Sequence, residues 1–331
     1  MLALVGCGYW GKNLLRVMDS LGVLYGFFDH DQSTAVQVSK QYPRSRKFES
    51  FAEILESDGV KGVVIAAPAV DHGSLARKCI EARKSAFVEK PLCLDPSEAQ
   101  MLVELADKNE VKLMVGHLLL YHPAFRKLKT MISEGVLGSI RQVYSNRLSL
   151  GKIRREENSL WSFAPHDISM ILSLMNDVLP EHVSCFGQSF LTSQVEDTTL
   201  SVLNFANGAF CHIFVSWLHP FKVQELVVIG DRAMASFSDS KPTSEKLLLY
   251  PHQAAIEQGV PIIQKATPIR VDYDDEEPLK LELVAFLEYL RADVKPPSIG
   301  NEGLRVLKVL SACQRALESR QTIRLEDVYV R

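Results

Sequence analysis

Three glycines near the start of the chain have the spacing of a dinucleotide-binding turn. The segment GCGYWG places Gly6, Gly8 and Gly11 directly after an apolar run at residues 2–5. In such a turn the first glycine permits a sharp bend, the second lets a pyrophosphate approach the backbone, and the third allows close packing of helix on strand. Asp29 ends the next apolar run, where a carboxylate can accept hydrogen bonds from both ribose hydroxyls of an adenosine. The pattern predicts dinucleotide binding.

The same acidic position indicates which dinucleotide is bound. Asp29 and Asp31 would repel a 2′-phosphate, and no arginine follows at once to neutralise one. Asp29 could instead cap the helix expected from Gln32, and both roles could hold together. We therefore expect NAD rather than NADP.

Two later residues could carry acid–base chemistry. Lys90, in the tripeptide EKP at residues 89–91, ends a predicted strand at the edge where open α/β sheets bind ligands. The alternative for Lys90 is a packed stem with its ammonium in water. His166 follows Pro165 and is expected at the start of a helix, where the positive helix end would keep its imidazole neutral and able to act as a base. The alternative for His166 is a simple helix-start contact.

The remaining reactive residues do not suggest a second kind of site. The six cysteines give no CxxC pair and no zinc-ligand spacing, and the chain has no GxSxG nucleophile motif. We therefore expect free thiols, no metal site and no hydrolytic activity.

Length and composition indicate an ordinary globular chain with two domains. It has 331 residues, 47% of them hydrophobic and 23% charged, and a net charge of −3. This slight negative charge disfavours a general nucleic-acid binder or a membrane-surface protein. No apolar run is long enough to span a bilayer, and residues 1–6 resemble a strand and not a leader. We expect a cytoplasmic protein.

The elements that position these motifs fall into two parts. Residues 1–118 alternate short apolar runs with amphipathic stretches, which predicts an α/β Rossmann domain with a parallel sheet. Residues 119–331 contain long alternating runs, which predict an α/β domain with a large, mainly antiparallel, open-faced sheet. Strands are expected at residues 2–5, 23–28, 62–67, 86–89, 111–115, 199–205, 210–217 and 224–229, and helices near residues 124–134, 165–176, 279–292 and 301–318.

A basic stretch precedes His166 and bears on the substrate. Residues 141–157 contain five basic and two acidic side chains, a local charge of 5 − 2 = +3. Guanidinium groups match phosphate oxygens, so Arg147, Lys152 and Arg154 are candidates to hold a diphosphate-linked substrate. A solvated basic hairpin is the alternative.

The order of these motifs resembles that of the Gfo/Idh/MocA oxidoreductases. The shared features are GxGxxG, an acidic strand end, EKP, the dipeptide GH at residues 116–117 and the dipeptide HD at residues 166–167. The stretches GCGYWGKN, GHLLLYHPA and LWSFAPHD are similar to those of sugar-nucleotide 3-dehydrogenases. The resemblance extends over essentially the whole chain.

This resemblance implies a site shared by a cofactor domain and a sheet domain. Lys90 and His166 match the positions that hold the reacting hydroxyl, and Tyr121 could line the pocket or simply pack as an aromatic. Many members carry Asp four residues before this histidine where this chain has Ser162, which leaves the choice of base between Lys90 and His166 open. The expected cofactor-binding residues are Gly6, Gly8, Tyr9, Trp10, Gly11, Asp29, Pro68, Glu89, Lys90 and His117, and the expected substrate-binding residues are Lys90, Tyr121, Arg147, Lys152, Arg154 and His166.

The activity implied is NAD-dependent oxidation of the C3 hydroxyl of UDP-N-acetylglucosamine or its uronic acid to a 3-keto sugar. His166 would remove the hydroxyl proton and Lys90 would stabilise the alkoxide. An aminotransferase would then use the product in lipopolysaccharide amino-sugar synthesis, and the chain would form a homodimer or homotetramer. A polyol or free-sugar dehydrogenase and a non-enzymatic NAD-binding regulator are the alternatives.

Overall fold

The computed structural model describes residues 1–326, which form two compact units. The first unit comprises Met1–Tyr121 and Glu277–Leu307, and the second comprises His122–Glu276 and the chain from Lys308. The division expected at residues 118–119 lies close to the first of these boundaries. The return of Glu277–Leu307 to the first unit had no counterpart in the sequence analysis.

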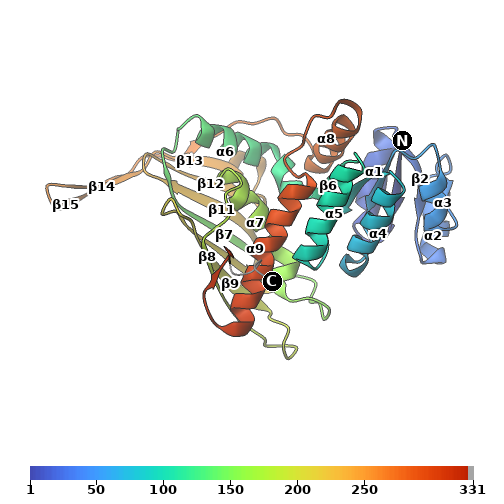
Figure 1. Cartoon of the computed structure of the whole chain (residues 1–331). Helices are drawn as coiled ribbons and strands as arrows, with labels where there is room; N and C mark the ends of the chain where they lie inside the picture. Colours follow the sequence, from blue (N-terminus) through green and yellow to red (C-terminus); the bar gives the residue numbers. More distant parts are fainter. Residues whose placement is uncertain (327–331) are drawn as a thin grey trace. The chain divides into compact units, whose positions relative to one another are not determined.

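The first unit is built on a six-stranded parallel sheet (Figure 1). Its strand order, β3-β2-β1-β4-β5-β6, reverses direction between β1 and β4, which is the topological switch point where dinucleotides bind in such sheets. Every residue of β1, β4, β5 and β6 is buried, as expected for parallel strands covered on both faces. The sheet confirms the predicted Rossmann domain. The strands are β1 (Leu2–Val5), β2 (Leu24–Phe28), β3 (Arg46–Lys47), β4 (Gly62–Ile65), β5 (Ser85–Glu89) and β6 (Leu113–Gly116).

Three helices of this unit, α2, α3 and α5, begin at a residue whose side chain caps them. The Asp95 carboxylate accepts the N–H groups of Ser97 and Glu98 at 2.6 and 3.1 Å and so caps α5. Asp31, and not Asp29, caps α2. None of the described helices is both long and apolar enough to cross a membrane. The helices are α1 (Gly11–Ser20), α2 (Gln32–Gln41), α3 (Phe51–Glu56), α4 (Ala69–Glu81), α5 (Pro96–Lys108), the 3₁₀ helix η1 (Leu118–Tyr121), α8 (Pro278–Ala292) and the start of α9 (Gly300–Ser319).

Helix α8 returns from far along the chain to cover β4 and β5. Its Phe286 is fully buried and packs edge-on against Phe87 of β5, with ring centroids 5.7 Å apart. A Cβ atom on Gly62 of β4 would lie 3.2 Å from Phe286 and from Leu290. The helix therefore packs directly on the sheet, and its apolar face forms part of the core of the first unit.

The second unit is a nine-stranded sheet in the order β16-β13-β12-β11-β7-β10-β9-β8-β17. Among the described strands of this sheet, only β7 and β10 pair in parallel. This confirms the predicted large, mainly antiparallel sheet. The strands are β7 (Ile140–Leu150), β8 (His182–Gln188), β9 (Thr198–Asn204), β10 (Phe210–Ser216), β11 (Leu218–Gly230), β12 (Met234–Ser238), β13 (Leu247–Tyr250), β16 (Ile269–Arg270) and β17 (Ile323–Arg324).

Two helices, α6 and α7, pack against this sheet. Helix α7 (Ser159–Leu174) contacts β7, β9 and β10, and α6 (Pro123–Ser133) contacts β12 and β13. Phe186, Leu200 and Phe210 alternate with the buried positions of their strands and are exposed. A separate hairpin of β14 (Gln253–Glu257) and β15 (Val260–Gln264) projects beyond the sheet (Figure 1).

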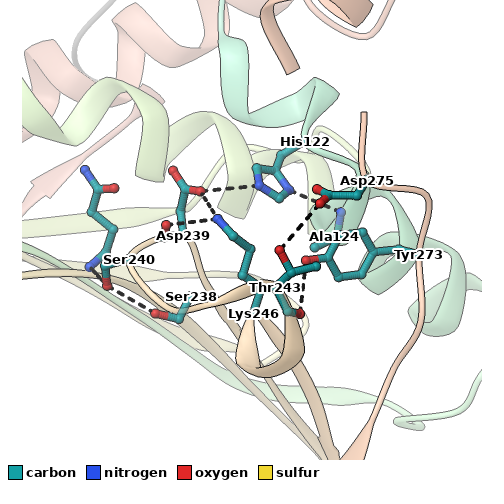
Figure 2. A network of polar contacts seen from close by, with 10 residues as sticks. His122, Ala124, Ser238, Asp239, Ser240, Thr243, Lys246, Tyr273 and Asp275 are labelled. Carbon is teal, nitrogen blue, oxygen red and sulfur yellow. Dashed lines mark hydrogen bonds and ion pairs between the residues drawn. The ribbon is translucent and has the colours of Figure 1, made fainter. Parts of the chain in front are cut away.

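A polar network joins the start of α6 to the turn after β12 (Figure 2). His122 caps α6, since its Nδ1 accepts the Ala124 N–H at 3.2 Å. Its Nε2 lies 3.3 Å from Asp239, which also accepts a hydrogen bond from Lys246 at 2.8 Å. The hydrogen bond from His122 and the ammonium of Lys246 hold the pKa of Asp239 well below its usual value. The aspartate thus remains charged and fixes the helix to the sheet.

The Asp197 carboxylate accepts the indole N–H of the fully buried Trp217 and the backbone N–H groups of Phe190 and Leu191. All six thiols are buried and free, and burial raises the pKa of Cys7 and of Cys79 to about 12.

We expect Phe286→Ala to lower the free energy of unfolding by about 3–5 kcal/mol, because it leaves a cavity between α8 and β5. Val36→Ala, at a position 45% exposed on α2, is the matched control and should change it by about 0.5 kcal/mol or less. Denaturant unfolding of the three proteins measures this difference. Equal losses in both variants would mean that α8 does not contribute to the core of the first unit.

Candidate active site

The three glycines of the first turn lie in surroundings compatible with the roles expected of them. Gly6 has a φ of +90°, and a Cβ atom there would lie 2.6 Å from the carbonyl oxygen of Ala66. A Cβ on Gly11 would collide with the carbonyl oxygen of Gly6, so this glycine permits close packing of α1. A Cβ on Gly8 would meet nothing within 4 Å. The backbone at Gly8 is therefore open to a ligand, and the turn fits a dinucleotide pyrophosphate.

Asp29 ties the end of β2 to this turn. Its Oδ2 accepts the backbone N–H of Cys7 at 2.6 Å, and its Oδ1 accepts that of Asp31 at 2.8 Å. A carboxylate can accept about four hydrogen bonds, so these two leave capacity for ribose hydroxyls. Because Asp31 is the helix cap, the carboxylate of Asp29 is available for the role that the sequence suggests.

Glu89 connects the glycine turn to the EKP segment. The indole N–H of Trp10 donates to Glu89 Oε1 at 2.5 Å, and the backbone N–H of Lys90 donates to Oε2 at 3.3 Å. A Cβ on Gly116 would lie 2.9 Å from the carboxyl carbon, so the absence of a side chain there makes room for Glu89. Burial raises the pKa of Glu89 to about 7, although these hydrogen bonds and the Lys90 ammonium oppose the shift.

The EKP turn is held by a histidine that the sequence analysis missed. The Lys90–Pro91 peptide is cis, and the carbonyl of Pro91 lies 2.7 Å from Nδ1 of the buried His72. The other ring nitrogen of His72 lies 2.8 Å from the carbonyl of Ala67, which precedes Pro68 at the cap of α4. His72 thus joins the turns after β4 and β5. Its signal in the sequence is a polar residue on the buried face of α4.

Two other expected site residues have partners from the returning segment. His117 Nδ1 lies 2.6 Å from Oε2 of Glu302, and both side chains are buried. The hydroxyl of Tyr121 lies 2.7 Å from that of Ser298 and is also buried. Tyr121 is therefore a packed, hydrogen-bonded aromatic of the first unit. The roles of Glu302 and Ser298 could not be recognised from the sequence, because only the fold brings residues 298–302 to β6.

The structure corrects the environment expected for His166. Helix α7 begins at Ser159, where the Asn158 side chain accepts the N–H of Trp161 at 3.2 Å and caps the helix. Pro165 lies inside this helix, and His166 lies in its middle. The expected helix start at Pro165 was wrong because the asparagine cap dominates, and the helix tolerates a proline that removes one backbone hydrogen bond. The positive end of a helix therefore does not act on His166.

The neighbouring Asp167 is held in a buried ion pair by Arg147 of β7. The guanidinium Nε and Nη2 of Arg147 lie 2.7 and 3.2 Å from the two carboxylate oxygens, and the Ser145 hydroxyl donates to the same carboxylate at 2.6 Å. The side chains of Arg147 and Asp167 are 10% and 1% exposed. The structure thus assigns Arg147 to orienting α7, whereas the sequence suggested contact with a diphosphate.

The rest of the basic stretch lies at the surface. Lys152 and Arg155 are exposed in the loop after β7, and Arg154 in the same loop pairs with Glu157 at 3.1 Å. Arg141, at the other end of β7, lies 3.6 Å from Asp231. Only residues 152–155 of the stretch therefore remain as a basic surface loop.

Tyr9 of the glycine turn is solvent-exposed. Residues 1–326 contain no cluster of histidine, cysteine and acidic side chains that could hold a metal ion.

We expect Arg147→Met to lower the free energy of unfolding by about 3–5 kcal/mol, because it leaves the Asp167 carboxylate buried without its cation. Arg147→Met combined with Asp167→Leu should lose less, since no unpaired charge remains. Arg141→Met, on the same strand but at an exposed pair, is the control and should cost about 1 kcal/mol or less. Denaturant unfolding gives these values, and equal losses for the two single variants would show that the buried pair has no special role.

Known proteins share the fold of this chain over nearly its whole length. The chain is 24% identical over 95% of its length to UDP-N-acetylglucosamine 3-dehydrogenase of Acidithiobacillus ferrooxidans, of which 96% is covered. The crystal structure of that enzyme has a TM-score of 0.84, covering 96% of this chain and 97% of that one. The chain is also 22% identical to myo-inositol 2-dehydrogenase of Thermotoga maritima, with 99% of both chains covered.

A third similar protein is the WlbA dehydrogenase from Bordetella pertussis, solved with NADH and UDP-GlcNAcA. It is 20% identical, with a TM-score of 0.79 and 98% of both chains covered. Residues 1–117 match the family description "Oxidoreductase family, NAD-binding Rossmann fold", and residues 125–236 match the GFO/IDH/MocA C-terminal domain. The chain therefore belongs to the Gfo/Idh/MocA oxidoreductases, and its first unit carries the NAD-binding Rossmann fold of that family.

Proposed function

We propose that this oxidoreductase uses NAD to oxidise the C3 hydroxyl of UDP-N-acetylglucosamine or its uronic acid to the 3-keto sugar. The observation that carries the proposal is similarity to a UDP-N-acetylglucosamine 3-dehydrogenase over nearly the full length of both chains. The dinucleotide turn and the presence of Lys90 in EKP and of His166 in HD support it.

The residues of this chain have two tasks in the proposed reaction: to accept the proton of the substrate hydroxyl and to stabilise the negative charge that develops on its oxygen. A histidine is ordinarily largely neutral near pH 7 and can accept a proton, whereas a lysine is ordinarily cationic. We assign proton removal from the hydroxyl to His166, and stabilisation of the alkoxide to Lys90, whose charge acts most strongly in the transition state. NAD held at the glycine turn would supply the acceptor for the hydride that leaves the sugar carbon.

The exposed loop at residues 152–155 supports a nucleotide-linked substrate. The loop contains Lys152, Arg154 and Arg155. Arg147, in contrast, is held in an ion pair with the buried Asp167. Guanidinium groups bind diphosphate oxygens through paired hydrogen bonds, and a free sugar has no such group. The loop therefore favours a UDP-sugar.

A polyol is the second candidate substrate, because the chain is equally extensively similar to a myo-inositol 2-dehydrogenase. Oxidation of a polyol requires the same proton acceptor and the same cofactor but no contact with phosphate. The two candidates therefore differ in what the basic loop does.

The proposal includes partners on both sides of the reaction. A 3-keto sugar nucleotide is a substrate for transamination, so an aminotransferase of lipopolysaccharide amino-sugar synthesis is the expected consumer. The exposed apolar residues Phe186, Leu200 and Phe210 on one sheet face suit contact with a second copy of the chain, as a homodimer or homotetramer. The cytoplasm, where NAD and UDP-sugars are available, is the proposed location.

We expect His166→Asn and Lys90→Met each to lower turnover by roughly 10²- to 10⁴-fold, because one loses the proton acceptor and the other the charge beside the alkoxide. NAD affinity should be unchanged in His166→Asn, as measured by quenching of protein fluorescence. His182→Asn, the same chemical change on β8, is the control and should keep parental turnover. If neither His166→Asn nor Lys90→Met slows hydride transfer, these residues are not the active site.

We expect Arg154→Ala to raise the KM for the UDP-sugar about tenfold and to leave kcat nearly unchanged, since a phosphate contact is the same in ground and transition states. Arg141→Ala is the matched control. NADH absorbance should be followed with UDP-N-acetylglucosamine, its uronate and myo-inositol. Equal KM values in the two variants would count against a phosphate contact, and faster oxidation of myo-inositol would favour the second candidate.

A further inference from the structure

Glu282 of α8 is a fully buried carboxyl group that the proposed reaction does not use. Its side chain is 0% exposed, and neither carboxyl oxygen has a hydrogen-bond partner. A buried carboxylate without a hydrogen bond or a cation is very unfavourable, so such a group retains its proton. Burial, reinforced by the nearby charges of Glu89 and Glu302, raises the pKa of Glu282 well above its usual value.

The neighbours of Glu282 are other ionisable groups of the first unit. Glu302 of α9 lies 2.6 Å from His117 at the end of β6, and α8 contacts η1, which carries Tyr121. Glu89 of β5 interacts with Lys90 and His117 and receives the indole N–H of Trp10. Phe286, one turn after Glu282 on α8, packs on Phe87, two residues before Glu89 on β5, so Glu282 lies towards the Glu89 end of that strand.

These three carboxyl groups differ in what stabilises their charged forms. Glu89 accepts hydrogen bonds from Trp10 and from the backbone of Lys90, and Glu302 has His117. Glu282 has neither kind of support. Since like charges in a dry interior cannot all ionise, the anion belongs on Glu89 and the retained proton belongs on Glu282. Glu89 then gains or loses its own proton near neutral pH.

We propose that Glu89 and Glu282 form a buried proton-holding site next to Lys90, and that this site receives the proton lost by the substrate hydroxyl. The second half of the proposal depends on the dehydrogenase function proposed above. The hydroxyl O–H bond breaks, and the hydride leaves carbon with its electron pair for the cofactor. The proton passes through the base beside the hydroxyl to the Glu89 carboxylate and forms a new O–H bond there. The charge of the pair changes from −1 to 0, and solvent later removes the proton.

The first test measures whether Glu282 is protonated in the folded protein. In the unfolded chain this group ionises above its usual pKa of 4.5, whereas the folded protein keeps its proton, so the parent loses stability as pH rises above 4.5. Glu282→Gln cannot ionise in either state. The unfolding constant of the parent relative to Glu282→Gln should therefore rise by about tenfold per pH unit through the neutral range.

Glu288→Gln is the control, because Glu288 is exposed on the same helix. The unfolding constant of the parent relative to that of Glu288→Gln should be independent of pH. A ratio for Glu282→Gln that is also independent of pH would overturn the proposal. If Glu282→Gln does not fold, Glu282→Met replaces it, since an apolar side chain of similar volume suits this dry position.

The second test follows Glu89 through Trp10 in the protein without ligands. The indole that donates to Glu89 should change its fluorescence as the carboxylate takes up a proton, with a midpoint near pH 7. Trp10→Phe isolates this signal from Trp161 and Trp217, and Glu89→Gln should abolish the titration. A Trp10 signal that is flat through the neutral range would overturn the proposal.

The third test asks where the substrate proton goes. In a single turnover followed by NADH absorbance and a pH indicator, proton release from the parent should lag behind NADH formation. The lag should shorten several-fold in Glu89→Gln, which cannot accept the proton. Simultaneous release in the parent, or an unchanged lag in the variant, would overturn the second half. Absence of NADH formation with every sugar would instead reject the proposed dehydrogenase function, and the two earlier tests would still decide whether the proton site exists.

Discussion

Burial of carboxyl groups at the carboxyl edge of the parallel sheet constrains the polar contacts of the first unit. A buried charge must find donors or give up its ionisation, and at this edge three glutamates meet that requirement in different ways. Glu89 takes its donors from Trp10 in the glycine turn and from the backbone of Lys90. One dehydrated carboxyl group thereby connects the cofactor turn to the strand end that carries the proposed catalytic lysine.

The second unit satisfies the same requirement with other partners. Asp167 is matched to Arg147 and Ser145, and Asp197 receives an indole N–H and two backbone N–H groups. In each case an acid from one segment receives its donors from segments far away in the sequence. These acids fix helix to strand and strand to loop, and so give α7, with His166 in its middle, a defined position on the sheet.

Features that depend on a few consecutive residues could be predicted from the sequence. The glycine turn and the strand ends at Asp29 and Lys90 are of this kind, because local backbone geometry and hydrophobic period decide them. The environment of His166 could not be predicted, since the Asn158 cap and an internal proline compete for the helix start. The roles of Arg147, Glu302 and Glu282 were also hidden, because each depends on a partner that only the folded chain brings near.

The burial of all six cysteines has a consequence for how the two units can be followed. A thiol reacts as its thiolate, and a buried thiol of raised pKa reacts only when the surrounding structure opens. Cys7, Cys79 and Cys93 belong to the first unit, and Cys185, Cys211 and Cys313 belong to the second. Each unit therefore contains three native cysteines whose alkylation rates report how often that unit opens. No label has to be introduced for this measurement.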